Sequence, residues 1–333
     1  MTRQSDIQTF LTSAGLKDPK VSPLAGDASS RRYWRVAHTG TSYVLMDAPR
    51  ESGLDIGPYL GVALHLRNYG YSAPEILAHD TASGFVLMED LGDSLYARLL
   101  ANTRDAELPI YEAAVDVLID LAQQEPPLST EPYDANDMAQ KSALAGKWYA
   151  GRSEVSHFIW ENLKPLLMEA EQAPQTLVLR DYHAENLIWL PDRTGLKRVG
   201  LLDFQDAMVG PVGYDLISLL DDARRDVSPS IKAPLVDRYT CGTGLDLETM
   251  LRLNALLTVQ RSLRILGVFA RLSLYFSKPN YVDLIPRVWA QMTRALEHPV
   301  HSSFRAGLMD ALPEPNTAHL SDLRARCGTI RTL

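Results

Sequence analysis

The sequence predicts an α+β protein with two lobes, a small N-terminal lobe on a mostly antiparallel sheet and a larger, mainly helical C-terminal lobe. Short alternating apolar runs bounded by turn residues dominate the first 92 residues. Apolar residues at helical spacing dominate after them. The length of 333 residues also exceeds what one simple core holds. We therefore expect lobes at 1–92 and 93–333, with a short hinge at 89–92.

The N-terminal lobe is expected to begin with a short amphipathic helix at 4–15, which ends at Gly15. A turn at 26–30 separates two strands, and a second helix is expected at 55–69. The remaining strands alternate apolar and polar residues between turn signals, and they are expected at 33–36, 42–46, 74–79 and 84–88. This pattern is typical of a small antiparallel sheet with one crossing helix.

The C-terminal lobe is predicted from long stretches with helical periodicity. The expected helices lie at 96–100, 109–124, 136–150, 154–170, 214–222, 231–239, 247–274 and 282–296. Two strand–turn units between 176 and 211 interrupt them, and the tail from Pro299 is less periodic. The most apolar stretch, 263–276, contains Arg264 and Arg271, so it predicts a buried helix rather than a membrane span.

Composition narrows the classes of function. The net charge of −8 leaves no broad basic field, which argues against nucleic acid and anionic membranes as partners. Only two cysteines occur, and the first ten residues lack the apolar core of a signal peptide, so we expect a cytoplasmic protein. No zinc-ligand spacing and no phosphate-binding GxxxxGK[ST] loop is present.

The two strand–turn units carry the chemistry. Asp181 and Asn186 form a D-x-x-x-x-N pattern after the first strand, and Asp203 ends the apolar run 199–202, just before Phe204. Each aspartate alone could be an ordinary turn residue. Together they supply one base and two oxygen ligands for a hard cation, which is the set that phosphoryl transfer from a magnesium nucleotide requires.

These motifs resemble those of a known family. The stretch 180–186 resembles the catalytic loop of protein-kinase-like enzymes, and 202–206 resembles their metal-binding turn. Asp206 and the pattern G-P-x-x-x-D-L at 210–216 resemble the aminoglycoside phosphotransferase and choline kinase branch. The phrases GDASSRRYWRV, VLMDAP, LMEDLGD and LRDYHAENLIWL are most similar to bacterial kinases of that branch that phosphorylate N-acetylmuramate and N-acetylglucosamine at the anomeric position. The resemblance spans roughly residues 20 to 290.

The resemblance implies a bilobal protein-kinase-like fold and an ATP- and Mg²⁺-dependent kinase of cell-wall sugar recycling. It implies Asp181 as catalytic base and Asn186 and Asp203 as metal ligands. A loop over the phosphates would comprise Gly26, Ala28, Ser29, Ser30 and Arg31. The backbone groups of Glu89 and Leu91 would meet adenine. The loop could also be an ordinary hairpin turn, and 88–91 a plain connector.

Two departures from the family pattern stand out. Leu179 occupies the place of the usual histidine, and Met46 that of the lysine that binds the α- and β-phosphates. No lysine occurs between Lys20 and Lys141, so an arginine must take that role. The candidates are Arg31, Arg32 and Arg35, since an arginine offers a planar fork to phosphate. The alternative is a nucleotide-binding pseudokinase without turnover.

The acceptor site is the least specified part. His183, Glu185 and Asp206 lie close to the base in sequence. Arg261 and Arg264 share a helix and could meet the lactyl carboxylate of N-acetylmuramate, or form an ion-paired or solvated helix face. A phosphotransferase for a cationic aminoglycoside or choline remains the alternative enzyme, although these arginines suit an anionic acceptor better.

Overall fold

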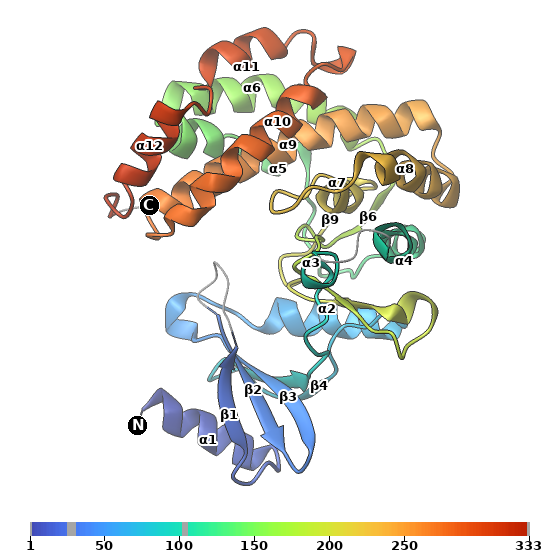
Figure 1. Ribbon diagram of the computed structural model, residues 1–333, viewed down its shortest axis with the longest axis vertical. Coiled ribbons are helices and arrows are strands. Elements are labelled where there is room, and N and C mark those ends of the chain that lie inside the picture. Colours follow the sequence, from blue (N-terminus) through green and yellow to red (C-terminus); the bar gives the residue numbers. More distant parts are fainter. Residues whose placement is uncertain (1, 25–30, 102–105, 332–333) are drawn as a thin grey trace. The chain divides into compact units, whose positions relative to one another are not determined.

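The structure is a computed structural model that describes residues 2–24, 31–101 and 106–331. The chain forms two compact units. The first comprises Met1–Val117 and Ala184–Ala207, and the second comprises Leu118–His183 and Met208–Leu333. The division expected from the sequence, 1–92 and 93–333, concerns functional lobes and stays a prediction. The α+β class, with an antiparallel sheet followed by a mostly helical remainder, is confirmed (Figure 1).

The first unit is built on a five-stranded antiparallel sheet in the order β1-β2-β3-β5-β4. The strands are β1 (Lys20–Leu24), β2 (Arg32–His38), β3 (Thr41–Asp47), β4 (Ile76–Asp80) and β5 (Phe85–Glu89). Thr39 and Gly40 join β2 to β3 with φ angles of 47° and 83°. Positive φ at both turn positions matches the right-handed twist of a tight hairpin, which fixes the β2–β3 register.

The two faces of this sheet have different partners. Trp34, Val36 and Leu45 form one cluster with the apolar side of α1 (Arg3–Ser13). Successive strand residues point to opposite faces, so Tyr33 and its ladder partner Met46 lie on the other face. The helix α2 (Gly57–Asn68) lies on that face, where the Tyr59 hydroxyl donates to Met88 Sδ at 3.0 Å.

The first unit also contains the hairpin that carries the predicted metal ligands. It consists of β7 (Leu187–Trp189) and β8 (Val199–Leu201), with Leu187 opposite Leu201. A short helix, α3 (Tyr96–Leu99), follows the hinge, and 3₁₀ turns occur at Arg50–Ser52 and Gly195–Arg198. The helix α4 (Glu107–Leu121) runs from the first unit into the second.

The second unit is helical apart from one two-stranded ladder of β6 (Gln175–Val178) and β9 (Met208–Pro211). Its helices are α5 (Ala135–Ser142), α6 (Ser153–Ala170), α7 (Tyr214–Leu220), α8 (Pro229–Thr243), α9 (Leu247–Leu274), α10 (Ile285–Ala295), α11 (Arg305–Ala311) and α12 (Thr317–Ala325). The 28-residue α9 packs against α5 and α10 and is buried on most of its surface, as expected of a core helix (Figure 1). Turns at Pro279–Leu284 and Pro299–His301 flank α10.

Two segments differ from the expected pattern. The helix expected at 136–150 is divided into α5 and a π-helical turn, Ala145–Tyr149. A Cβ on Gly146 would lie 2.2 Å from the Ser156 backbone nitrogen, so α6 approaches too closely for an ordinary residue there. The tail after Pro299 forms α11 and α12. Each buries a single leucine, which is too little apolar periodicity to recognise in sequence.

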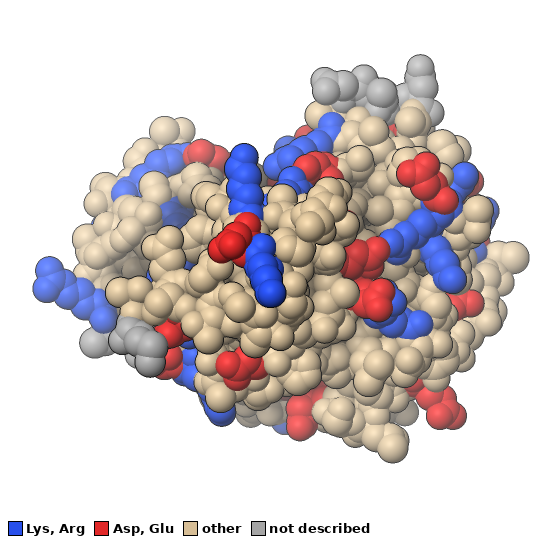
Figure 2. Space-filling view, turned by 90° about the horizontal axis from the view of Figure 1, so that it is seen from below, with Lys and Arg blue, Asp and Glu red and all other residues tan. Residues whose placement is uncertain are grey.

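Charge and hydropathy agree with the sequence analysis. Figure 2 shows lysine, arginine, aspartate and glutamate interspersed among uncharged residues, without a large field of one sign on the visible face. Within the described ranges, no helix has the length and hydropathy needed to cross a membrane. The arginine-interrupted stretch 263–276 lies largely within α9, where most of its side chains are buried, as predicted.

Candidate active site

The predicted catalytic residues are divided between the two units, with Asp181 in the second and Asn186 and Asp203 in the first. In the first unit, Asn186 directly precedes β7, and its carbonyl accepts the Leu202 N–H at 3.0 Å. Asp203 follows β8 by two residues. The hairpin therefore brings Asn186 and Asp203 to the same end of one ladder, on adjacent turns.

The backbone at Asp203 is unusual. Its φ is 56°, in the left-handed region that residues with a Cβ rarely adopt. Such conformations cost free energy and persist where the surrounding structure imposes them, often at functional sites. Here the next residue, Phe204, is buried and stacks on Tyr59 with ring centroids 4.9 Å apart. The buried ring anchors the turn while the Asp203 carboxylate remains partly exposed.

The donor set at this turn fits a hard divalent cation. An amide oxygen from Asn186 and a carboxylate from Asp203 are ligands of the kind that Mg²⁺ takes in proteins. Glu185 and Asp206 are exposed on the same two turns. No cluster of three or more His, Cys, Asp or Glu side chains suited to a metal occurs among the described residues. A site with few protein ligands is typical of Mg²⁺ that also binds substrate phosphates.

Sequence reasoning missed Gln205. Its amide nitrogen donates to Asp203 Oδ1 at 2.7 Å, and only 6% of the residue is exposed. A buried amide with a fixed partner restricts the rotamer of the carboxylate it holds. The only sequence signal was its position two residues after the predicted metal ligand, in D-F-Q.

Met46, at the position where the family usually has a phosphate-binding lysine, is a buried packing residue. Met46 is fully buried on the sheet face shared with Tyr33. The helix α2 contains no aspartate or glutamate, so neither a cation on β3 nor an acid on α2 is present. Tyr59 of α2 contacts Met88 and Phe204 instead. An aromatic and thioether group thus packs here in place of charged side chains.

The three candidate arginines have different environments. Arg32 is exposed and, by strand alternation, lies on the α1 face. Arg35 lies 2.7 Å from Asp90 and 2.8 Å from Asp93, so all its charge is directed at the hinge. Burial and Asp203 raise the pKa of Tyr33, and the charge of Arg31 lowers it. Arg31 is therefore the candidate whose charge acts on the same tyrosine as Asp203 of the predicted metal-binding turn.

The four other predicted loop residues, Gly26, Ala28, Ser29 and Ser30, lie outside the described residues. At the hinge, Glu89 ends β5, and its N–H donates to the Glu75 carbonyl at 2.8 Å. The Glu89 side chain pairs with Arg193. Leu91 is buried and borders a hollow of about 360 Å³ that Trp189 also lines. The hinge is thus held by ion pairs on both sides.

In the second unit, Asp181 follows β6 and keeps 30% of its side chain exposed. Arg264 Nη2 of α9 lies 3.5 Å from Asp181 Oδ1. Burial raises the pKa of Asp181, but Arg264, His183, Arg180 and Arg261 outweigh it, and the pKa lies below its ordinary value. The carboxylate is therefore ionised at neutral pH and can accept a proton.

Asp215 of α7 shapes the turn that carries Asp181. Its two carboxylate oxygens accept the N–H groups of Leu179 at 2.5 Å and Arg180 at 2.9 Å. Arg180 has a φ of 69°, so this buried acid holds a left-handed residue just before the predicted base. Burial raises the pKa of Asp215 to about 7, despite the opposing backbone hydrogen bonds.

His183 and Arg261 are both buried. Burial, aided by Arg224, lowers the pKa of His183 to about 4, so the ring is neutral at pH 7, with Nε2 3.1 Å from Arg224 Nη1. Arg261 is 4% exposed and donates to the Asp221 carbonyl at 3.0 Å. This favours a structural role for Arg261 over direct contact with an acceptor. Arg264 donates to the Tyr214 hydroxyl as well as contacting Asp181.

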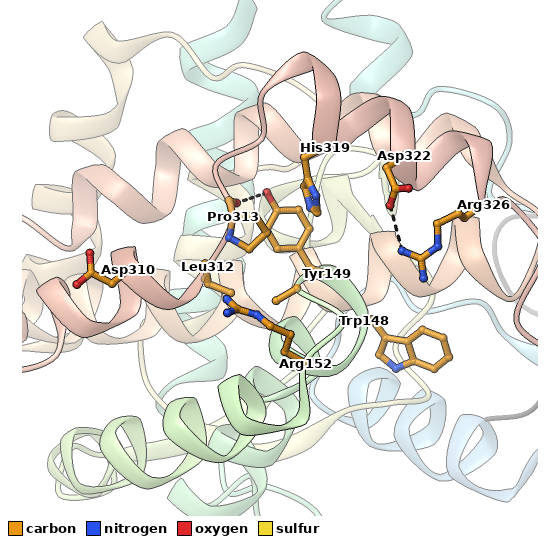
Figure 3. Close-up of a pocket in the computed structure, with 11 residues that line it drawn as sticks. Trp148, Tyr149, Arg152, Asp310, Leu312, Pro313, His319, Asp322 and Arg326 are labelled. Atoms are coloured by element: carbon orange, nitrogen blue, oxygen red, sulfur yellow. Dashed lines mark hydrogen bonds and ion pairs between the residues drawn. The ribbon is translucent and has the colours of Figure 1, made fainter.

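A separate hollow of about 300 Å³ lies in the second unit between the π-helical turn and the C-terminal helices (Figure 3). In Figure 3, Arg326 pairs with Asp322 at 3.0 Å and the Tyr149 hydroxyl donates to the Pro313 carbonyl at 2.7 Å. None of the predicted site residues that the structure describes lines it.

Comparisons with known proteins agree with this arrangement. The model of the phosphotransferase enzyme family matches residues 20–253. The N-acetylmuramate/N-acetylglucosamine kinase of Caulobacter vibrioides is 36% identical, with 91% of this chain and 95% of that protein covered. Among solved structures, a putative aminoglycoside phosphotransferase from Ralstonia eutropha has a TM-score of 0.65 at 15% identity, covering 88% of this chain and 97% of its own. Amicoumacin kinase bound to AMP-PNP and Ca²⁺ has a TM-score of 0.61 at 14% identity, covering 91% and 98%.

Proposed function

The chain belongs to the phosphotransferase enzyme family, and we propose that it transfers the γ-phosphoryl group of ATP to the anomeric hydroxyl of N-acetylmuramate or N-acetylglucosamine. The observation that carries the proposal is the 36% identity to a kinase named for these two sugars over 91% of this chain. The structural similarity to a putative aminoglycoside phosphotransferase, at 15% sequence identity, concerns the fold only. The reaction forms a sugar 1-phosphate and ADP.

Asp181 is proposed as the base. In the transfer, the bond from the γ-phosphorus to the bridging oxygen of ADP breaks, and a bond to the anomeric oxygen forms. The hydroxyl proton passes to Asp181, whose lowered pKa keeps it ionised. A loose transition state requires the proton to leave late, so a weak base that orients the hydroxyl is sufficient. Arg264 orients this carboxylate from α9.

Asn186 and Asp203 are proposed as the ligands of Mg²⁺. A bound divalent cation would offset the charge of the phosphates during transfer. Arg31 is proposed as the cation that replaces the usual lysine, because Arg31 and Asp203 both act on the ionisation of Tyr33. The loop with Gly26, Ala28, Ser29 and Ser30 would cover the phosphates, and backbone groups of Glu89 and Leu91 would meet the adenine.

The acceptor contacts are proposed at residues close to the base in sequence, with His183, Glu185 and Asp206 offered to the hydroxyl and acetamido groups. Arg264 and Arg261 make the surroundings of Asp181 positive, which suits the lactyl carboxylate of N-acetylmuramate and disfavours a cationic aminoglycoside or choline. The proposal places the enzyme in the cytoplasm, in recycling of cell-wall sugars, where its two unpaired cysteines would stay reduced.

The test is incubation of the purified protein with ATP, MgCl₂ and each sugar. ³¹P NMR should show a phosphomonoester coupled to the anomeric proton, and Asp181→Asn should reduce turnover by at least about a hundredfold. Kanamycin and choline in the same assay separate the alternative acceptors. Absence of product from both sugars would refute the sugar assignment, and full activity in Asp181→Asn would refute the mechanism.

A further inference from the structure

Gln205 is a buried polar residue within the predicted metal-binding turn, 202–206, and no motif explains its role. Its side-chain nitrogen donates to Asp203 Oδ1 at 2.7 Å, and the residue is 6% exposed. Its side-chain oxygen, Oε1, is buried and has no hydrogen-bond partner among the described residues. A glutamine that uses its donor on a functional carboxylate and leaves its acceptor unsatisfied calls for a functional account.

The cost of this arrangement argues against simple packing. An unsatisfied buried amide oxygen costs about 1–3 kcal/mol. A methionine or leucine would fill a similar volume without that cost. The backbone of Asp203 is also held at a φ of 56°. Two unfavourable features two residues apart are expected where the turn is selected for the placement of the Asp203 carboxylate rather than for stability.

We propose that Gln205 is a positioning residue for the divalent cation: the hydrogen bond from its amide holds the Asp203 carboxylate in the orientation that binds the metal. The proposal rests on the assignment of Asp203 as a metal ligand. The hydrogen bond to Oδ1 restricts the rotamers open to the Asp203 carboxylate. A neutral side chain performs this orientation without adding charge to the site.

The consequence is a loss of metal affinity when the amide is removed. Partners that orient metal ligands typically contribute 10–100-fold to metal affinity. Gln205→Met, which keeps the length and removes both polar atoms, should raise the Kd for Mn²⁺ by that factor. Gln205→Leu serves as a second apolar variant in case one shape packs poorly. The effect must pass through Asp203, so Gln205→Met added to Asp203→Asn should cause no further loss.

The experiment measures Mn²⁺ binding by electron paramagnetic resonance, with and without AMP-PNP, and requires no turnover. Gln291→Met is the matched control, because Gln291 is also a buried glutamine, and it donates to the Asp222 carbonyl in the second unit. It should lower the melting temperature but leave the Kd for Mn²⁺ unchanged. Thermal unfolding of every variant verifies that it is folded.

The outcomes distinguish a failure of the metal role of Asp203 from a failure of the positioning role of Gln205. If the unmodified protein binds no Mn²⁺, the metal role of Asp203 fails together with this proposal. If it binds Mn²⁺ and both apolar variants of Gln205 bind it within twofold of the same Kd, the positioning role is wrong. Losses that multiply in the double variant would also overturn it, since Gln205 would then act independently of Asp203. Failure to phosphorylate either sugar would leave the Mn²⁺ measurement intact.

Discussion

Removal of the positive charge beside Asp181 provides the sharpest test of the proposed base. Arg264 Nη2 lies 3.5 Å from Asp181 Oδ1. Two unit charges at that separation interact by about 1.2 kcal/mol in bulk water and about 4.7 kcal/mol at an effective dielectric constant of 20. Asp181 keeps 30% of its side chain exposed and Arg264 keeps 14%, so solvent screening favours the lower part of this range, about 1.4–2.7 kcal/mol or one to two pKa units.

The sign follows from the protonation state that Arg264 favours. A nearby cation stabilises the carboxylate and lowers the pKa of Asp181. In Arg264→Met the pKa of Asp181 should rise, and the acid limb of kcat/KM should move to higher pH by about one to two units. Loss of the hydrogen bond from Arg264 to the Tyr214 hydroxyl could lower the plateau, but the position of the limb does not depend on the plateau height.

The assay is the initial rate with N-acetylglucosamine, which has no carboxylate of its own to titrate, from pH 4 to 9. Ionisation of ATP affects both enzymes equally and cancels in the comparison. Arg252→Met is the control, because Arg252 is on the same helix and pairs with Glu169 on the surface. An acid limb that stays within about 0.3 pH units of the unmodified enzyme would show that Arg264 does not act on the catalytic ionisation.

Three further predictions follow from the charged groups. Arg35→Ala removes the ion pairs with Asp90 and Asp93 at the hinge. Initial rates at varied ATP should then give a KM for ATP that is about tenfold higher, with kcat within twofold, and an unchanged KM would contradict the hinge role. Arg31→Ala should lower kcat/KM for ATP about 10²–10³-fold, with partial recovery in Arg31→Lys, and unaltered kinetics would place the cation elsewhere. The raised pKa of Asp215, about 7 against an ordinary value of 3.8, means that its contribution to stability is present below pH 4 and is lost as pH rises to 7. Urea unfolding should show this loss, and Asp215→Asn should flatten it; the same slope in both proteins would contradict the prediction.

The chain's local patterns were sufficient for most of the elements before Pro299 and for the candidate catalytic and metal-binding residues. Alternation predicted the sheet strands, and helical periodicity predicted α9. The roles of Asp181, Asn186 and Asp203 stay predictions, but their places at strand ends were visible because each follows or precedes a short apolar run. The family resemblance read from the same motifs is confirmed.

Contacts between distant residues could be recognised only from the tertiary structure. Arg264 and Asp181 are far apart in sequence, and no periodicity shows that an α9 arginine reaches the turn after β6. The same holds for Arg35, which resembled a phosphate-binding cation until the hinge carboxylates were seen around it. In each case several charged residues were equally good partners by sequence, and the fold selected one.

The difference between what the sequence predicted and what only the tertiary structure showed has a physical origin. Strand alternation, helical spacing and turn chemistry depend on neighbours within a few residues, so the sequence by itself determined the order of the elements and the D-x-x-x-x-N and D-F motifs. Charge pairing and burial depend on which elements pack together. Only the tertiary structure therefore decided that Met46 is a packing residue, that Gln205 holds Asp203, and that Arg264 rather than Arg261 contacts Asp181.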